Sequence, residues 1–212
     1  VTNTQDTSGD VLERRPVSVT RETLEALLPR FTGALLQVPP MYSAIKINGQ
    51  KLYQLARQGR EVERPARPVT IRELELLGQD AQGDWLLRVL CSKGTYVRTL
   101  CHDMGQALGC GGCMSSLRRT MATGFTLADS HTLEEVQAHG EALLAPADSL
   151  FRQYSAYAVP SPEAERRCRC GNPLTADVPD GLYRVYGGDG TFLCLSRAEN
   201  GILTSLKNFF GA

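Results

Sequence analysis

Four side chains that could bind an anion or a nucleotide base lie together in one short turn. Lys93, Thr95, Tyr96 and Arg98 belong to the stretch CSKGTYVRTLCHDMGQALGCG, residues 91–111. An arginine can hold a carboxylate or a phosphate through two parallel hydrogen bonds. A tyrosine ring can stack on an exposed base, at roughly 1–3 kcal/mol per base. These residue types describe a pocket for an unstacked nucleotide. A capped helix start, with the arginine paired to a nearby acid, is the structural alternative and is equally well supported by the pattern.

The turn is expected to join a strand to a helix. Residues 85–91 form an apolar run that is typical of a strand. Apolar side chains then recur every four residues from Leu100 to Leu108, which predicts a helix over residues 95–108 that stops at Gly109. Backbone N–H groups at a helix start favour anions. The predicted elements therefore place the turn where a charged substrate could be held.

The remaining patterns predict an α+β protein with two domains. Expected strands lie at 69–77, 85–91, 116–119 and 123–127, and expected helices follow Thr20 and Thr132. The first domain is expected to cover residues 1–149, with an insertion around 38–67 in which Asn48-Gly49 forms a tight turn. Residues 150–212 contain short β-like runs separated by Gly, Asp and Asn, so they are expected to form a small β-rich domain.

The balanced charge of the whole chain indicates no particular partner, whereas one region carries an excess of positive charge. The chain has 212 residues, 42% of them hydrophobic, with 23 basic and 23 acidic side chains. Residues 43–119 contain 12 Lys and Arg against 7 Asp and Glu, a net charge of +5, which could face an RNA backbone. A solvated mixed-charge surface explains this excess equally well. Seven cysteines, an odd number, and the lack of a membrane-length apolar run predict a cytoplasmic protein without a membrane partner.

The cysteine spacings offer rival functions. Cys110 and Cys113 have the spacing of a redox dithiol or half of a zinc site. A thioredoxin-type pair precedes its helix, however, and this pair follows one. Zinc would need two further ligands, and the one-residue spacer between Cys168 and Cys170 is too tight for a metal knuckle. Structural free thiols are the favoured interpretation, and zinc is the alternative.

Histidine and tyrosine residues elsewhere in the sequence add no further site. The three histidines, His102, His131 and His139, share no spacing and are expected on the surface or at caps. Tyr183 and Tyr186 lie in an alternating β run, so core packing is the expected role for them.

Three ordered motifs resemble one known family. The 91–111 stretch, the preceding QVPPMYSAIKINGQKLYQLARQGREVER and the following SSLRRTMATGF are similar to the bacterial TruB family of tRNA pseudouridine synthases. The resemblance implies isomerisation of a T-loop uridine (a tRNA pseudouridine-55 synthase) that is flipped out of the tRNA T-arm. It also implies that no metal or organic cofactor is needed, that the parent protein is monomeric, and that residues 150–212 are PUA-like.

The resemblance also implies residue roles. Tyr96 would stack on the flipped uridine and take part in proton handling, and Arg98 would pair with the catalytic aspartate and keep it ionised. Leu117 would line the apolar wall of the pocket. Lys93 is predicted to contact the substrate on a different ground, the positive charge that it adds to the turn. Phosphate contacts are implied for the four cations of the insertion, Lys46, Lys51, Arg57 and Arg60.

The catalytic-aspartate motif of the family is missing from the sequence. The catalytic aspartate of the family lies in a Gly-x-Leu-Asp-x-x-Ala-x-Gly motif, and the 212 residues contain no Leu-Asp pair. Asp6, Asp10 and Asp103 are expected to be structural rather than nucleophilic. The chain is therefore expected to be the latter part of a TruB protein and inactive in isolation. A non-catalytic RNA-binding fragment is the alternative function, and a β-domain protein without RNA affinity is a third, weaker one.

Overall fold

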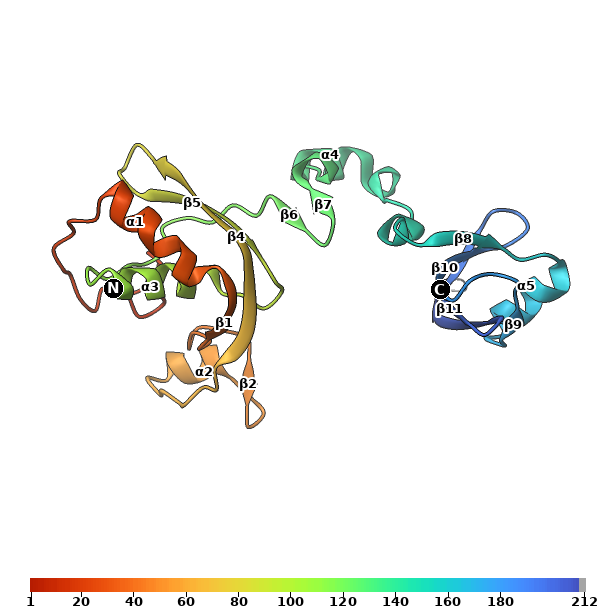
Figure 1. Ribbon diagram of the computed structural model, residues 1–212, viewed down its shortest axis with the longest axis horizontal. Helices are drawn as coiled ribbons and strands as arrows, with labels where there is room; N and C mark the ends of the chain where they lie inside the picture. The colour runs from red at the N-terminus through yellow and green to blue at the C-terminus, as the bar shows by residue number, and fades with distance from the viewer. Residues whose placement is uncertain (210–212) are drawn as a thin grey trace. The chain divides into compact units, whose positions relative to one another are not determined.

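The computed structural model describes residues 1–209, which fall into two compact units (Figure 1). The N-terminal unit comprises Val1–Arg118, and the C-terminal unit comprises Arg119–Ala212. The domain boundary predicted between residues 149 and 150 lies inside a short 3-10 helix, η4 (Ala147–Phe151), and stays a prediction. Each unit has its own hydrophobic core. The predicted α+β class with a small β-rich C-terminal domain is confirmed.

The N-terminal unit is built on an antiparallel sheet of three strands. The sheet has the order β1 (Gly33–Gln37), β4 (Arg67–Gln79), β5 (Trp85–Cys91). The strands predicted at 69–77 and 85–91 thus pair as a hairpin, with its second strand at the predicted bounds and its first strand longer at both ends. Its register shifts between Ile71 and Glu73 and again between Leu76 and Gly78, which marks two bulges in β4.

Two helices cover one face of this sheet (Figure 1). They are α1 (Arg21–Leu27), which continues into the 3-10 helix η1 (Leu28–Phe31), and α3 (Val97–Ala107). Thr20 caps α1 through a reciprocal pair of bonds with Thr23, as its residue type predicts. The buried core joins the helices to the middle strand and consists of Leu24, Leu27, Ile71, Leu76, Leu100 and Met104. Because α3 begins directly after β5, this packing fixes the turn between them.

The insertion forms a small hairpin and a helix. Strands β2 (Lys46–Ile47) and β3 (Gln50–Lys51) are joined by Asn48 and Gly49, whose φ angles of 50° and 80° suit a two-residue hairpin turn. Helix α2 (Leu52–Arg57) follows and buries Leu52 and Leu55. The predicted Asn48-Gly49 turn is confirmed.

The two strands predicted after residue 115 do not extend the sheet. Residues 116–119 form no strand and no bridge. The nearest ladder contact before them is the single bridge of Met114 to Asp6. The second prediction, 123–127, is one arm of a separate hairpin between β6 (Met121–Ala122) and β7 (Phe125–Thr126). Thr123 and Gly124 form its turn with positive φ angles. Short apolar runs of this kind indicate extended chain without indicating its partner.

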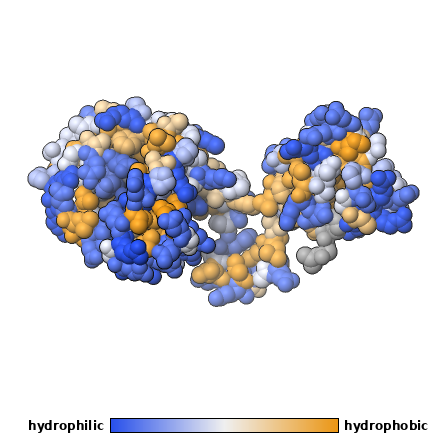
Figure 2. All heavy atoms as spheres, turned by 90° about the horizontal axis from the view of Figure 1, so that it is seen from below, coloured by the Kyte–Doolittle hydropathy of each residue, from blue (hydrophilic) through white to orange (hydrophobic). Residues whose placement is uncertain are grey.

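The segment from residue 119 to 151 exposes much apolar surface (Figure 2). Its exposed large side chains are Met121, Phe125, Leu127, Leu133, Val136, Leu144 and Leu150. Its elements are η2 (Leu127–Asp129), α4 (Leu133–His139), η3 (Gly140–Leu143) and η4. Two of them begin with reciprocal capping bonds, from Thr126 to Asp129 and from Thr132 to Glu135. Local capping rather than burial therefore stabilises these short helices.

The C-terminal sheet has five strands in the order β8-β10-β11-β12-β9. Their bounds are β8 (Ser155–Ala158), β9 (Leu174–Thr175), β10 (Gly181–Tyr186), β11 (Phe192–Glu199) and β12 (Ile202–Asn208). Tyr183 is buried in the core, as predicted, whereas Tyr186 is half-buried and donates its hydroxyl to Asp148 at 2.7 Å. Sequence reasoning missed α5 (Pro162–Arg169), although Ser161 at its cap and Pro162 at its first position are start signals.

None of the helices within residues 1–209 combines the length and the apolarity that crossing a bilayer requires.

Ile71 is expected to support the core on which α1 and α3 pack. Its side chain is 0% exposed, whereas that of Leu36 in the neighbouring strand is 74% exposed. We expect Ile71→Ala to lower the free energy of unfolding by about 2–5 kcal/mol, because it removes buried methyl groups and leaves a cavity. Leu36→Ala should change it by under about 1 kcal/mol. Urea unfolding followed by circular dichroism measures both values, and equal losses would contradict this description of the core.

Candidate active site

The turn between β5 and α3 is fixed by its own hydrogen bonds. Ser92 N–H donates to Thr70 O at 2.8 Å and so extends the β4–β5 ladder by one step. The Thr95 hydroxyl donates back to Ser92 O at 2.9 Å. Between them, Gly94 has a φ angle of 86°, a conformation that costs other residues energy. This hydrogen-bonded turn determines the positions of Tyr96 and Arg98 relative to β5.

A buried glutamine at the end of β1 holds the start of α3. The Gln37 amide accepts from Tyr96 N–H at 2.8 Å and donates to Tyr96 O at 3.1 Å. Tyr96 is the N-cap residue of the helix and makes no side-chain capping bond, and Gln37 holds it through both of its backbone polar groups. Sequence reasoning missed Gln37, because no local pattern links it to a helix 59 residues away.

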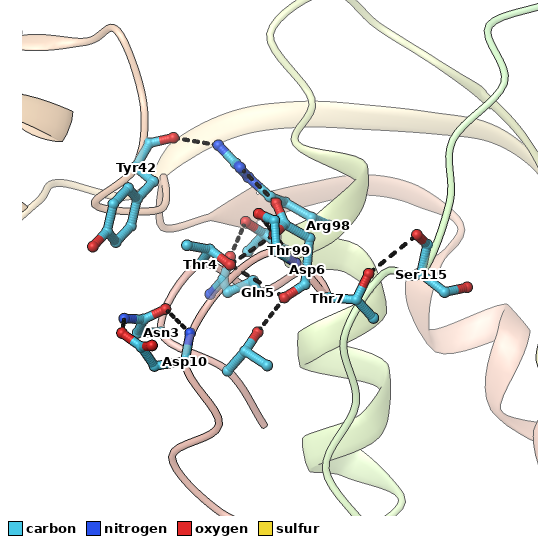
Figure 3. A network of polar contacts seen from close by, with 12 residues as sticks. Asn3, Thr4, Gln5, Asp6, Thr7, Asp10, Tyr42, Arg98, Thr99 and Ser115 are labelled. Carbon is cyan, nitrogen blue, oxygen red and sulfur yellow. Dashed lines mark hydrogen bonds and ion pairs between the residues drawn. The ribbon is translucent and has the colours of Figure 1, made fainter.

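Arg98 joins two distant segments of the chain (Figure 3). Its Nη1 donates to Asp6 Oδ2 at 3.0 Å, and its Nη2 donates to the backbone carbonyl of Tyr42. The side chains of Arg98 and Asp6 are only 22% and 17% exposed. A charge pair of such low exposure must be well hydrogen-bonded to be tolerated. The guanidinium therefore acts as a fixed anchor rather than as a mobile surface charge.

The Asp6 carboxylate accepts bonds on both of its oxygens. Oδ1 accepts from the Thr4 hydroxyl at 2.7 Å, the Ser8 hydroxyl at 2.5 Å and Ser8 N–H at 3.1 Å. Burial raises the pKa of Asp6, but the hydrogen bonds from Ser8, Thr4 and Arg98 outweigh it and lower the pKa to about 2. Asp6 is thus ionised at neutral pH and is occupied by donors.

The loop that carries Asp6 is held against α3 and the chain after it. Gln5 Oε1 accepts from the Thr99 hydroxyl at 2.7 Å. Thr7 N–H donates to Met114 O at 3.0 Å, and Met114 N–H donates to Gln5 O at 3.0 Å (Figure 3 shows the side chains of this loop). The loop is therefore bonded on both sides of Asp6.

Two glycines allow the chain that leads to Met114 to pass close to α3. A Cβ atom on Gly105 in α3 would lie 2.3 Å from Gly112 N, a distance that no side chain tolerates. Gly105 and Gly112 therefore permit the contact that carries the chain to Met114, beside Asp6.

A cavity of about 360 Å³ lies next to the arginine network. Its lining residues come from the first loop, the Pro39-Pro40 segment, α3 and residues 61–64; they are Val1, Thr2, Asn3, Gln5, Leu12, Val38, Pro39, Pro40, Met41, Glu61, Arg64, Thr99, His102 and Asp103. Arg64 and His102 each have a buried nitrogen without a hydrogen-bond partner in the described structure. Burial also raises the pKa of Asp103. Neither Tyr96 nor Arg98 lines this cavity.

The other predicted site residues lie outside this network. Lys93 is exposed at the β5–α3 turn. The Leu117 side chain is 56% exposed and does not line the cavity, so its role in a pocket wall stays a prediction. The four predicted phosphate contacts, Lys46, Lys51, Arg57 and Arg60, all lie on or directly after the β2–β3–α2 insertion.

Of the three aspartates expected to be structural, Asp6 is the one that contacts a predicted site residue. Asp10 instead accepts from the Asn3 amide at 3.1 Å. The signal that could have identified Asp6 is its place in the Thr- and Ser-rich stretch TNTQDTSGD, which supplies several donors to one carboxylate.

The cysteines make no metal cluster in the described residues. All seven are free thiols, and residues 1–209 contain no group of three or more His, Cys, Asp or Glu side chains that could hold a metal ion. Cys110 and Cys113 are half-buried, and the Cys110 thiol donates to Gly111 O at 3.2 Å.

Two solved structures share the fold of this chain. A chain of the "Cbf5-Nop10-Gar1 complex" aligns with 92% of it at a TM-score of 0.65 and 21% identity, over 63% of its own length. A chain of an "H/ACA RNP bound to a substrate RNA containing 2'-deoxyuridine" aligns with 94% of it at a TM-score of 0.58 and 19% identity, over 64% of its own length. At such identities the likeness establishes the fold alone.

Sequence comparison identifies the family. The model of the TruB family pseudouridylate synthase N-terminal domain matches residues 1–97, and that of the tRNA pseudouridylate synthase B C-terminal domain matches residues 98–152. The tRNA pseudouridine synthases B of Stutzerimonas stutzeri and Ectopseudomonas mendocina are 49% and 48% identical over 91% and 94% of the chain. The chain belongs to the TruB family. It spans 66% and 68% of the length of these two relatives.

The Asp6–Arg98 pair predicts an acid-sensitive contribution to stability. The folded-state pKa of Asp6, about 2, lies below its ordinary value of 3.8. The contribution is therefore present above about pH 4 and is lost as the pH falls from about 4 to about 2. We expect Asp6→Asn to lower the free energy of unfolding by about 1–2 kcal/mol at pH 7, a value reduced for partial solvent screening.

The measurement is urea unfolding of both proteins at a series of pH values. The difference between them should shrink toward pH 2. Asp10→Asn is the control, because the Asp10 carboxylate accepts from an amide instead of a guanidinium. A difference that stays constant from pH 7 to pH 2 would contradict the assignment.

Proposed function

We propose that this chain is part of a tRNA pseudouridine-55 synthase, which isomerises a T-loop uridine flipped out of the tRNA T-arm in the cytoplasm. The observation that carries the proposal is Arg98, a guanidinium of low exposure fixed at the start of α3 and already aimed at a carboxylate. Such a fork can fix an acid in one orientation and keep it ionised. The half-buried Tyr96, two residues earlier, supplies a ring for the base.

We further propose that the carboxylate that attacks the uridine is not among these 212 residues. The family motif that carries it needs a Leu-Asp pair, which the sequence does not contain. Asp6 is a poor substitute, because three donors occupy one of its oxygens and Arg98 occupies the other. Its role in this proposal is to hold Arg98 in place.

The RNA contact is proposed at the insertion. Residues 43–60 contain Lys46, Lys51, Arg57 and Arg60 and no acidic side chain. The ion pairs recorded for residues 1–209 involve none of these four cations. Unneutralised basic charge on an exposed segment favours a phosphate backbone.

The isolated chain is expected to make no pseudouridine. Incubation with a T-arm hairpin RNA, followed by chemical detection of pseudouridine, should give no product above background, because the attacking carboxylate is missing. The full-length tRNA pseudouridine synthase B of Stutzerimonas stutzeri is the positive control. Turnover by the 212-residue chain would show that another residue acts as the nucleophile.

RNA binding is the second expected property, and both candidate functions require it. The chain should bind a T-arm hairpin with an affinity that falls as salt rises. Lys46→Gln and Arg60→Gln should each weaken binding and lower the slope of log affinity against log salt by about 1. Arg21→Gln is the matched control, because Arg21 is already paired with Glu25 at 2.7 Å.

Fluorescence anisotropy at several salt concentrations measures these values. Binding without turnover is the result expected of this chain, which would then act as a non-catalytic RNA-binding part of a synthase. Binding with turnover would show that the chain carries the synthase activity itself. The absence of any RNA binding would contradict both candidate functions.

A further inference from the structure

Two cations of the insertion lie over one aromatic ring. Lys51 Nζ is 5.7 Å from the centroid of the Tyr53 ring, and the central guanidinium carbon of Arg57 is 5.4 Å from it. Both distances are within the roughly 6 Å over which the negative face of a ring attracts a cation. One tyrosine ring thus attracts both a residue of β3 and the last residue of α2.

Backbone hydrogen bonds and buried neighbours fix the position of Tyr53. Tyr53 N–H donates to Ser43 O at 3.0 Å, and Leu52 N–H donates to Ile45 O at 2.8 Å. The flanking side chains of Leu52 and Leu55 are buried. Tyr53 is itself half-buried, so its ring can restrict the two longer side chains without being mobile itself.

One of the two cations, Arg57, has room for an anion beside it. Arg57 lines a hollow of about 400 Å³ whose other lining residues are Gln50, Gln54, Leu55 and Gln58, none of which carries a charge. Two positive side chains gathered at one ring repel each other, and an anion between them would relieve that repulsion. A free lysine or arginine also loses up to about 2 kcal/mol of rotamer freedom when it binds. Prior restriction by the ring reduces that loss.

We propose that Tyr53 is a positioning residue that holds Lys51 and Arg57 as a paired clamp for the phosphodiester backbone of the bound RNA. This inference rests on the RNA-binding function proposed above and assigns the clamp to one ring. The cations contact the phosphates, and the tyrosine sets their separation and direction. The phenol hydroxyl has no part in the clamp, because the face of the ring makes the contact.

Replacement of the ring tests the clamp. Tyr53→Leu keeps an apolar side chain and removes the ring face, and Tyr53→Phe keeps the face and removes the hydroxyl. We expect Tyr53→Leu to weaken binding of a T-arm hairpin RNA by about threefold to tenfold and to lower the salt slope, since the cations lose their shared partner. Tyr53→Phe should bind like the unaltered chain. Thermal unfolding by circular dichroism checks that both variants are folded.

A double-variant cycle separates positioning from direct stacking on a base. In a background of Lys51→Gln and Arg57→Gln, the further change Tyr53→Leu should have almost no effect on affinity, because nothing remains to be positioned. An equal loss in both backgrounds, or a loss with an unchanged salt slope, would overturn the clamp in favour of base stacking. Equal binding by Tyr53→Leu and the unaltered chain would also overturn it.

The same data distinguish failure of the clamp from failure of the proposed function. Failure of the clamp alone leaves the unaltered chain binding RNA with a salt dependence that responds to Lys46→Gln and Arg60→Gln. Failure of the proposed function leaves the unaltered chain without RNA affinity, and the clamp is then rejected with it.

Discussion

The polar network of the N-terminal unit depends on the hydrogen bonds of the Arg98 guanidinium. A planar, permanently charged fork of low exposure needs acceptors in fixed directions, and it finds them in the Asp6 carboxylate and the Tyr42 carbonyl. One side chain thereby holds three segments that are far apart in sequence. Because an unpaired charge in this position would be costly, the loop before α1, the Tyr42 segment at the start of the insertion and the start of α3 are constrained to one arrangement.

The position of that fork is set by rigid neighbours. The closed turn after β5 and the amide of Gln37 fix the first turn of α3, and the close contact of Gly105 with Gly112 brings Met114 alongside Asp6. A helix start held on several sides offers a fixed site for charge, as catalysis by electrostatic positioning requires. The hydrophobic core supplies this rigidity, since α3 buries Leu100 against the sheet.

Hydrogen bonds also connect the insertion to this centre. Ser43 O accepts from Tyr53 N–H, and the neighbouring carbonyl of Tyr42 accepts from Arg98. The proposed phosphate clamp and the guanidinium are therefore joined through two adjacent peptide units. An RNA held at the insertion would have its backbone placed in a defined relation to the acid-binding fork, without any movement of the sheet. This short connection gives a physical reason for the PPMYS segment to be placed between the two.

The sequence by itself determined the local elements and the residues at the turn. The apolar run at residues 85–91, the four-residue spacing from Leu100 to Leu108 and the Asn48-Gly49 turn are short-range signals, and each led to the element that the structure contains. The tertiary structure alone decided that Arg98 pairs with Asp6, that Gln37 holds Tyr96, and that residues 116–119 join no sheet. The reason is that periodicity shows which face of an element is apolar, whereas the partner of a polar side chain depends on how distant segments pack.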